Sequence, residues 1–262
     1  MTEIINGTEI NYETMGTGVH KVLLLHGWGC DLSLMRPVAN ALSDTHSLLL
    51  VDLPGHGKSG RPPEPWGVPE YAKTIKELLL RVSFSPCSVI AHSFGCRIAT
   101  WLAADDQHIF NKIVFTGAAG IKPVPSPEAQ KKSRRFKKLK AYCNAIEKMP
   151  LPGIASLAEN WEEKLRQKYG SRDYNALDAE MRKTFVKVIS LDLTDLYEKI
   201  AQSTLLIWGD QDTETPLWMG QKMETLIPDA GLVILQGGSH FAYLEQLQQF
   251  VIITRTFLKG DQ

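Results

Sequence analysis

The sequence predicts an α/β protein with a mostly parallel central sheet and helices on both faces of that sheet. Extended apolar runs alternate along the chain with longer segments of helical period, which is typical of such a sheet. The length of 262 residues and the 44% hydrophobic content allow one large core with an insertion. We therefore expect one α/β core and not several small domains.

The first predicted element is a β-hairpin. Glu3–Ile5 and Glu9–Tyr12 flank Asn6-Gly7, a dipeptide suited to the left-handed angles of a tight turn. Further buried strands are expected at Val22–Leu25, Leu48–Val51, Ser88–Ile90, Ile113–Thr116, Leu205–Trp208 and Leu232–Leu235. Helices are expected around Leu34–Leu42, Tyr71–Val82, Phe94–Ala104, Met219–Ile227 and Leu244–Leu258.

One segment breaks the alternation of strands and helices. Between residues 122 and 190 there is no strand candidate, prolines open the segment, and the rest is polar and helix-forming. This pattern predicts a helical cap, residues 122–190, inserted into a core formed by residues 1–121 and 191–262.

Charge and composition limit the partners and the cellular compartment that we expect for this protein. The 29 basic and 29 acidic residues cancel, so charge gives no reason to expect nucleic acid or an anionic membrane as a partner. No apolar run approaches the roughly 20 residues of a membrane span, and the first residues do not resemble a secretory signal. We expect a cytoplasmic protein without a metal or cofactor, whose cysteines are free thiols: Cys30, Cys87, Cys96 and Cys143.

The most informative motif is Ala91-His92-Ser93-Phe94-Gly95. It places a serine between an apolar run and a helical segment, with small residues two positions before and two positions after it. Such a strand-turn-helix forces the serine backbone into a strained conformation and lifts Oγ clear of the sheet. Ser93 is therefore the candidate nucleophile, although alanine stands where the G-x-S-x-G pattern has its first glycine.

Five motifs in a consistent order carry a resemblance to a known family. They are His26-Gly27-Trp28-Gly29, Asp52-Leu53-Pro54-Gly55-His56-Gly57-Lys58-Ser59, the Ser93 motif, Trp208-Gly209-Asp210-Gln211-Asp212 and Gly238-Ser239-His240. The chain resembles the α/β-hydrolase superfamily with an inserted cap, over nearly all of its length except the insertion. Within the superfamily it is similar to serine carboxylesterases, including those that act on methyl esters of carrier-protein-bound acyl chains.

A serine hydroxyl needs a base to act as a nucleophile at neutral pH, and the base needs an acid to orient it. His240 is the candidate base, because it lies on a glycine-rich loop after the last predicted strand and matches the family's order. His26 and His92 are nearer to Ser93 in sequence. The resemblance implies that His26 supports the loop after the Val22–Leu25 strand, which would bind the oxyanion. It implies that His92 belongs to the turn that carries Ser93.

Two neighbouring aspartates compete for the role of the acid. The family's acid lies three positions after a glycine such as Gly209, which favours Asp212. Asp210 is the alternative, and its other role would be a solvated loop residue or a helix cap. Asp52 is a third option, although its motif favours anchoring of its own loop.

The tetrahedral intermediate needs donors that already point at its oxyanion. By resemblance these donors are the backbone N–H groups of Trp28 and Phe94. The side chains of both residues could also line an acyl pocket or serve only in packing. Arg97 could bind a substrate carboxylate or form a structural ion pair.

The insertion contains a basic stretch. Seven basic residues and no acid occur between residues 131 and 140: Lys131, Lys132, Arg134, Arg135, Lys137, Lys138 and Lys140. The stretch, with Phe136 and Leu139, could be a solvated face or could dock an anionic partner such as an acyl carrier protein. Tyr142 and Trp161 could line a tunnel under the cap or pack between helices.

Together these observations predict a serine hydrolase that cleaves small carboxylic esters through an acyl-enzyme. Its partner would be a small-molecule ester or an anionic carrier-bound substrate, and the enzyme would be a monomer or a homodimer. Two alternatives stay open: a carbon–carbon bond hydrolase or lyase with the same triad, and a ligand-binding sensor of this fold with little turnover.

Overall fold

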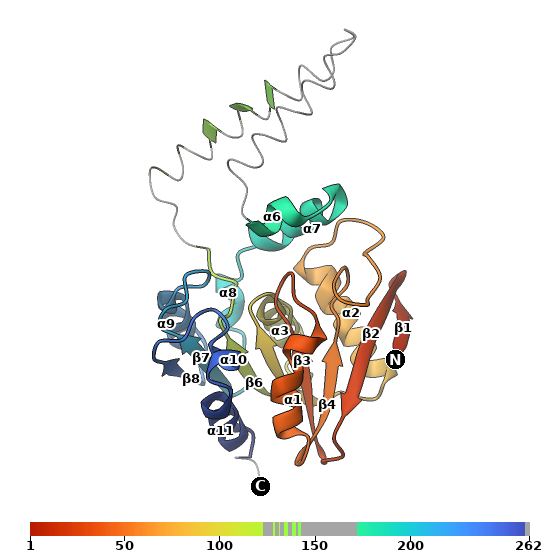
Figure 1. The fold of residues 1–262 in the computed structure, drawn as a ribbon, viewed down its shortest axis with the longest axis vertical. Helices are drawn as coiled ribbons and strands as arrows, with labels where there is room; N and C mark the ends of the chain where they lie inside the picture. The colour runs from red at the N-terminus through yellow and green to blue at the C-terminus, as the bar shows by residue number, and fades with distance from the viewer. Residues whose placement is uncertain are drawn as a thin grey trace. The chain divides into compact units, whose positions relative to one another are not determined.

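The computed structural model describes residues 1–122 and 172–259, together with residues 128, 131, 134, 135, 138, 139, 141 and 142. In these residues one eight-stranded sheet runs in the order β1-β2-β4-β3-β5-β6-β7-β8 (Figure 1). The strands are β1 (Thr2–Ile5), β2 (Thr8–Met15), β3 (His20–Leu25), β4 (His46–Val51), β5 (Cys87–His92), β6 (Phe110–Thr116), β7 (Thr204–Gly209) and β8 (Ala230–Leu235).

The sheet is parallel from β4 to β8 and antiparallel at the β1 and β2 edge. β1 and β2 form the expected hairpin, and Asn6 and Gly7 have the positive φ angles of 50° and 77° that its turn requires. Every predicted strand lies within an observed one. The predicted fold class is therefore confirmed.

The helices are η1 (Leu32–Leu34), α1 (Arg36–Leu42), α2 (Val68–Arg81), α3 (Phe94–Asp105), α6 (Arg172–Ala176), α7 (Ala179–Ser190), α8 (Thr194–Tyr197), α9 (Leu217–Leu226), α10 (Ala242–Glu245) and α11 (Leu247–Leu258). Two differ from the sequence prediction. The segment expected as one helix from Leu34 begins with a 3₁₀ turn, and α1 starts only at Arg36, with a proline in its first turn. The helix expected at 244–258 is divided at Gln246 into α10 and α11.

Alternating side chains of each central strand enter two separate cores, one on each face of the sheet. Leu23 and Leu25 of β3 pack with residues of α2, α3 and α9. Val22 and Leu24 of the same strand pack with residues of α1 and α11 on the other face. Both faces of the sheet are therefore covered, and functional side chains must come from the strand ends and the loops that follow them.

The chain divides into two compact units, Met1–Ile121 with Lys183–Gln262, and Lys122–Arg182. The described part of the second unit includes α6 and the start of α7. The role of residues 122–190 as a cap stays a prediction. In the basic stretch, Lys131, Arg134, Arg135 and Lys138 are exposed, as are Leu139 and Tyr142, whereas Lys132, Phe136, Lys137, Lys140 and Trp161 lie outside the described residues.

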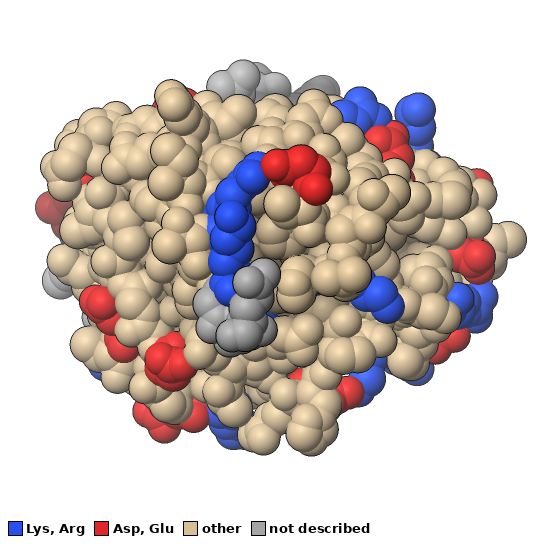
Figure 2. All heavy atoms as spheres, turned by 90° about the horizontal axis from the view of Figure 1, so that it is seen from below, with Lys and Arg blue, Asp and Glu red and all other residues tan. Residues whose placement is uncertain are grey.

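Among the helices that the structure describes, none is both long and apolar enough to cross a membrane. On the face of the molecule drawn in Figure 2, Lys and Arg side chains lie among Asp and Glu side chains, in keeping with a net charge of zero. Of the cysteines, Cys87 and Cys96 are buried and Cys30 is partly exposed, and no disulfide joins these three; Cys143 lies outside the described residues.

Candidate active site

The candidate site residues lie at the carboxyl ends of neighbouring parallel strands. Ser93 follows β5, the residues from His26 to Trp28 follow β3, and Asp212 and His240 lie on the loops that follow β7 and β8. Parallel strands end at the same edge of a sheet, and this edge is where open α/β sheets place their sites. The topology therefore brings segments together that are far apart in the sequence.

Ser93 has the strained backbone that the motif predicts. Its φ of 49° and ψ of −105° lie outside the regions that L-residues usually adopt. The turn is held by a hydrogen bond from the Ser93 N–H to the Thr116 carbonyl oxygen at 3.1 Å. Strain of this kind is retained where the surrounding structure fixes it, which is common at functional sites.

The glycines beside Ser93 allow its neighbours to approach closely. A Cβ atom at Gly95 would lie 2.7 Å from the Leu25 carbonyl oxygen, so this position of α3 has no room for a side chain. A Cβ atom at Gly27 would lie 3.3 Å from Cβ of Ser93. The loop after β3 therefore lies directly against the serine turn.

His26 is held inside that loop. Its Nδ1 lies 2.7 Å from the Gly27 carbonyl oxygen, and the Leu53 N–H donates to its Nε2 at 3.0 Å. Both ring nitrogens are thus engaged by the backbone. Burial, with a smaller contribution from His56, lowers the pKa of His26 to about 4, so the ring is neutral at pH 7.

His92 is also engaged by the backbone. Its Nε2 lies 3.0 Å from the carbonyl oxygen of His240, and since that oxygen can only accept, Nε2 carries the proton. Burial, with a smaller contribution from His240, lowers the pKa of His92 to about 3. His92 thus positions the His240 backbone.

His240 forms a buried pair with Asp212. Nδ1 of His240 lies 2.8 Å from Oδ2 of Asp212, and the two side chains are 7% and 0% exposed. The Asp212 Oδ1 atom accepts hydrogen bonds from the N–H groups of Glu214 and Thr215, each at 2.9 Å. Burial raises the pKa of Asp212, but these bonds and the His240 interaction outweigh it and lower that pKa below its ordinary value. The carboxylate is therefore ionised and fixes the imidazole in one orientation.

The structure brings Asp212, and not Asp210, to the histidine. Asp210 instead accepts a hydrogen bond from the Gly237 N–H at 2.6 Å, which ties the loop after β7 to the loop after β8. Asp52 lies in the β4 loop, where its carboxylate accepts from the Leu32 N–H, the Lys58 N–H and Asn11 Nδ2, each at 2.8 Å. With these contacts Asp52 anchors its own loop, as its motif favours.

Two backbone N–H groups have the surroundings expected of oxyanion donors. Phe94 is the first residue of α3, where helical N–H groups lack an intrahelical acceptor. Trp28 follows Gly27 in the loop against the serine turn. Neither N–H group donates to another residue in the described part of the chain. The oxyanion role of both groups stays a prediction.

The side chains of Trp28 and Phe94 belong to one aromatic cluster. Their ring centroids are 5.2 Å apart, and the Trp28 ring also lies 4.8 Å from His56 and 5.0 Å from Phe185. Phe94 is buried, whereas Trp28 is partly exposed. An apolar wall beside Ser93 is consistent with either an acyl pocket or simple packing.

Arg97 lies one turn into α3. Its Nη1 donates to the Val188 carbonyl oxygen at 3.2 Å and to the Leu191 carbonyl oxygen at 2.8 Å, and the residue is 7% exposed. These contacts attach the end of α7 and the residue that follows it to α3. Cys96 beside it is fully buried and donates to the Ala91 carbonyl oxygen at 3.0 Å, and burial raises its pKa, so it is held as an inert thiol.

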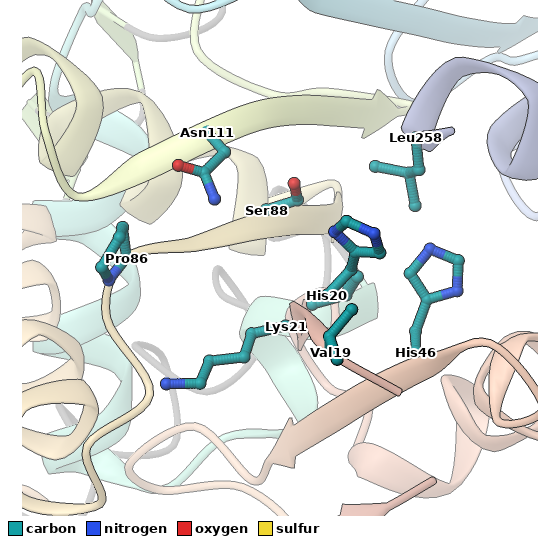
Figure 3. Close-up of a pocket in the computed structure, with 9 residues that line it drawn as sticks. Val19, His20, Lys21, His46, Pro86, Ser88, Asn111 and Leu258 are labelled. Carbon is teal, nitrogen blue, oxygen red and sulfur yellow. The ribbon is translucent and has the colours of Figure 1, made fainter. Parts of the chain in front are cut away.

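A cavity of about 520 Å³ lies at the opposite edge of the sheet, where the parallel strands begin. Figure 3 shows the imidazoles of His20 and His46 close to each other in this cavity, while Lys21 extends away from them. The Lys21 Nζ donates to the Ser83 carbonyl oxygen at 2.7 Å. The lining includes no carboxylate, so this cavity lacks the acid that a Ser-His-acid site needs.

Three residues of the site were not expected from the sequence. Thr215 Oγ1 donates to Asp212 Oδ2 at 2.8 Å, and Glu214 Oε2 lies 3.7 Å from Nε2 of His240. A Cβ atom at Gly117 would lie 3.1 Å from Nδ1 of His240. Gly117 could have been found from the sequence, because it directly follows a strand. The contacts of Thr215 and Glu214 depend on the fold of the loop after β7.

The fold and this arrangement define a hydrolase-type α/β protein with a serine turn and a His-Asp pair at one sheet edge. Residues 22–252 match the model of the alpha/beta hydrolase family. The chain belongs to that family, and the expected superfamily and hydrolase class are confirmed.

The chain is similar to curated relatives and to solved structures over nearly its whole length. The chain is 25% identical to the pimeloyl-[acyl-carrier protein] methyl ester esterase of Neisseria meningitidis serogroup C, over 95% of this chain and 97% of that protein. It is 26% identical to the protein of the same name from Chromobacterium violaceum, over 91% and 94%. The crystal structure of the enol-lactonase from Burkholderia xenovorans matches with a TM-score of 0.75 at 21% identity, over 99% and 100%.

Among the residues that the structure describes, no cluster of three or more His, Cys, Asp or Glu side chains could hold a metal ion. The chemistry proposed below uses only the chain's own side chains and backbone.

Proposed function

We propose that this protein hydrolyses small carboxylic esters through an acyl-enzyme formed on Ser93. The observation that carries the proposal is the buried His240–Asp212 pair on the loops beside the strained Ser93 turn. The His240 ring lies 4.7 Å from the ring of His92, the residue before Ser93, which supports His240 as the base for Ser93. The family and the names of the two esterase relatives support an ester as the substrate.

In the acylation step Ser93 Oγ attacks the ester carbonyl carbon and its proton passes to Nε2 of His240. The Nδ1–H group of His240 donates a hydrogen bond to Asp212, so Nε2 carries the lone pair that accepts the serine proton. The N–H groups of Trp28 and Phe94 donate to the oxyanion. When the intermediate collapses, the carbon–oxygen bond to the alcohol breaks and Nε2 returns the proton to the departing oxygen.

In the second step a water molecule gives a proton to Nε2 and attacks the acyl carbon. Collapse of this intermediate releases the carboxylic acid and returns the proton to Ser93 Oγ. In the described part of the chain no hydrogen bond joins Ser93 Oγ to His240. Contacts of this kind often tighten only when a substrate is bound.

The finer substrate class is part of the proposal. The exposed basic residues Lys131, Arg134, Arg135 and Lys138 support an anionic, carrier-bound ester. The names of the esterase relatives, which include an acyl-carrier protein, point the same way.

The test is turnover of p-nitrophenyl esters from acetate to octanoate by wild type and Ser93→Ala. The proposal predicts turnover with a chain-length optimum in wild type and its loss in the variant. Equal turnover by both proteins would overturn the proposal. Activity on a ring-fission diketone with none on esters would favour the carbon–carbon hydrolase, and tight ligand binding without turnover would favour the sensor.

A further inference from the structure

The reacting nitrogen of His240 has a carboxylate beside it that the mechanism above does not use. Nδ1 faces Asp212, whereas Nε2 lies 3.7 Å from Oε2 of Glu214. Nε2 is the atom that receives the serine proton and then carries the positive charge of the imidazolium. The two nitrogens of one ring therefore each have an acidic side chain nearby.

A hydrogen bond to Asp212 fixes the main chain of Glu214. Its N–H donates to Oδ1 of Asp212 at 2.9 Å, so both acidic residues are fixed on the same turn after β7. Its side chain is 63% exposed, so the carboxylate stays hydrated. Among the residues that the structure describes, the ionisable side chains against the His240 ring are Asp212, Glu214 and His92, and His92 is neutral at pH 7.

We propose that Glu214 is a positioning residue for the reaction, whose carboxylate stabilises the imidazolium that forms on His240 when Ser93 gives up its proton. The inference rests on the proposed function. The charge appears on His240 only as the reaction proceeds, so an interaction with it lowers the barrier more than it strengthens substrate binding. Because the side chain is exposed, water and salt screen most of the attraction.

The proposal predicts a change in the pH dependence of kcat/KM for a p-nitrophenyl ester. Neutral His240 is the active form, and the Glu214 charge favours the protonated form. Glu214→Gln therefore moves the midpoint of the acid limb to lower pH, by about 0.2 to 0.7 of a pH unit. On the alkaline plateau the same variant loses activity, by about two- to fivefold, because the imidazolium in the transition state has lost its partner.

Two further variants control for the change of residue. Glu214→Asp retains the charge and is expected to retain part of the wild-type midpoint. Glu9→Gln removes an exposed carboxylate on β2, which is five strand spacings from β7 and hence roughly 24 Å away. That distance exceeds the screening length in ordinary buffer, so Glu9→Gln should leave the midpoint at the wild-type value. Added salt should move the wild-type midpoint toward that of Glu214→Gln.

An unchanged midpoint in Glu214→Gln would overturn the proposal, and so would an equal shift in Glu9→Gln. Ser93→Ala is measured in the same assay. If ester turnover survives in Ser93→Ala, the proposed function itself fails and the role of Glu214 fails with it. If turnover is lost in Ser93→Ala while Glu214→Gln keeps the wild-type profile, only the role of Glu214 fails.

Discussion

Gly117 lies directly against His240: a Cβ atom at position 117 would stand 3.1 Å from Nδ1 of the imidazole. The same atom would be 3.3 Å from Oδ2 of Asp212, and Gly117 has a φ of 52°. A side chain here would strain the backbone and press on both members of the His-Asp pair.

Gly117→Ala is therefore expected to lower kcat/KM by about 10- to 100-fold, because small displacements of catalytic groups have effects of that size. The left-handed backbone should also reduce the free energy of unfolding by about 1–2 kcal/mol. The control is Gly231→Ala in β8, where an added Cβ meets nothing within 4 Å. Wild-type kcat/KM in Gly117→Ala would contradict this account of the pair.

Asp212→Asn and Asp210→Asn separate the two aspartates of the β7 loop. An amide in place of the Asp212 carboxylate cannot stabilise the imidazolium, so kcat is expected to fall by about 10³- to 10⁴-fold. Asp210→Asn keeps an oxygen that can accept from Gly237, so kcat should change by less than about threefold. Steady-state ester kinetics on both variants check the prediction, and the reverse ranking would reassign the acid.

Arg97→Met tests whether Arg97 acts on the fold or on a substrate. The Val188 and Leu191 carbonyl oxygens would lose their donor, which is expected to lower the free energy of unfolding by about 1–3 kcal/mol for each buried group left unsatisfied. The KM for a neutral ester should stay near the wild-type value. Urea unfolding and ester kinetics measure the two effects, with the exposed Arg36→Met as the control. A large rise in KM for a carboxylate-bearing ester, with unchanged stability, would instead support substrate binding by Arg97.

The buried histidines predict how stability depends on pH. The pKa values of His26 and His92 are about 4 and about 3 in the folded protein, below the ordinary value of 6.5 that applies after unfolding. Between these values the unfolded chain binds more protons than the folded chain, so stability is lost as the pH falls below about 6.5. Each histidine contributes a slope of up to about 1.4 kcal/mol per pH unit.

Urea unfolding at intervals between pH 7.5 and 5 measures this slope. A free energy of unfolding that stays constant from pH 6.5 to 5 would show that the two histidines are not buried in their neutral forms.

Much of the fold could be predicted because its central strands are apolar enough to stand out from the sequence. The predicted limits erred at polar strand ends such as His20 and His46, which pair with each other in the sheet although neither extends an apolar run. The division of the last helix at Gln246 and the short helix α8 also carry no strong periodic signal. Their limits depend on how the loops pack.

The candidate site also has residues that the sequence indicates and residues that it does not. Ser93, Asp212 and His240 could be named as candidates because each lies in a motif at a strand end. The contacts of Thr215 and Glu214 could not, because they depend on the fold of the β7 loop around Asp212. Arg97 stayed ambiguous in the sequence because its carbonyl partners lie more than 90 residues further along the chain.

The most direct test of the central claim is covalent labelling of Ser93 by a fluorophosphonate probe, followed by intact mass and localisation of the modified peptide. We expect one adduct on the peptide that contains Ser93, none in Ser93→Ala, and slow labelling in Asp212→Asn. An adduct on another residue, or equal labelling of Ser93→Ala, would contradict the assignment of Ser93 as the nucleophile.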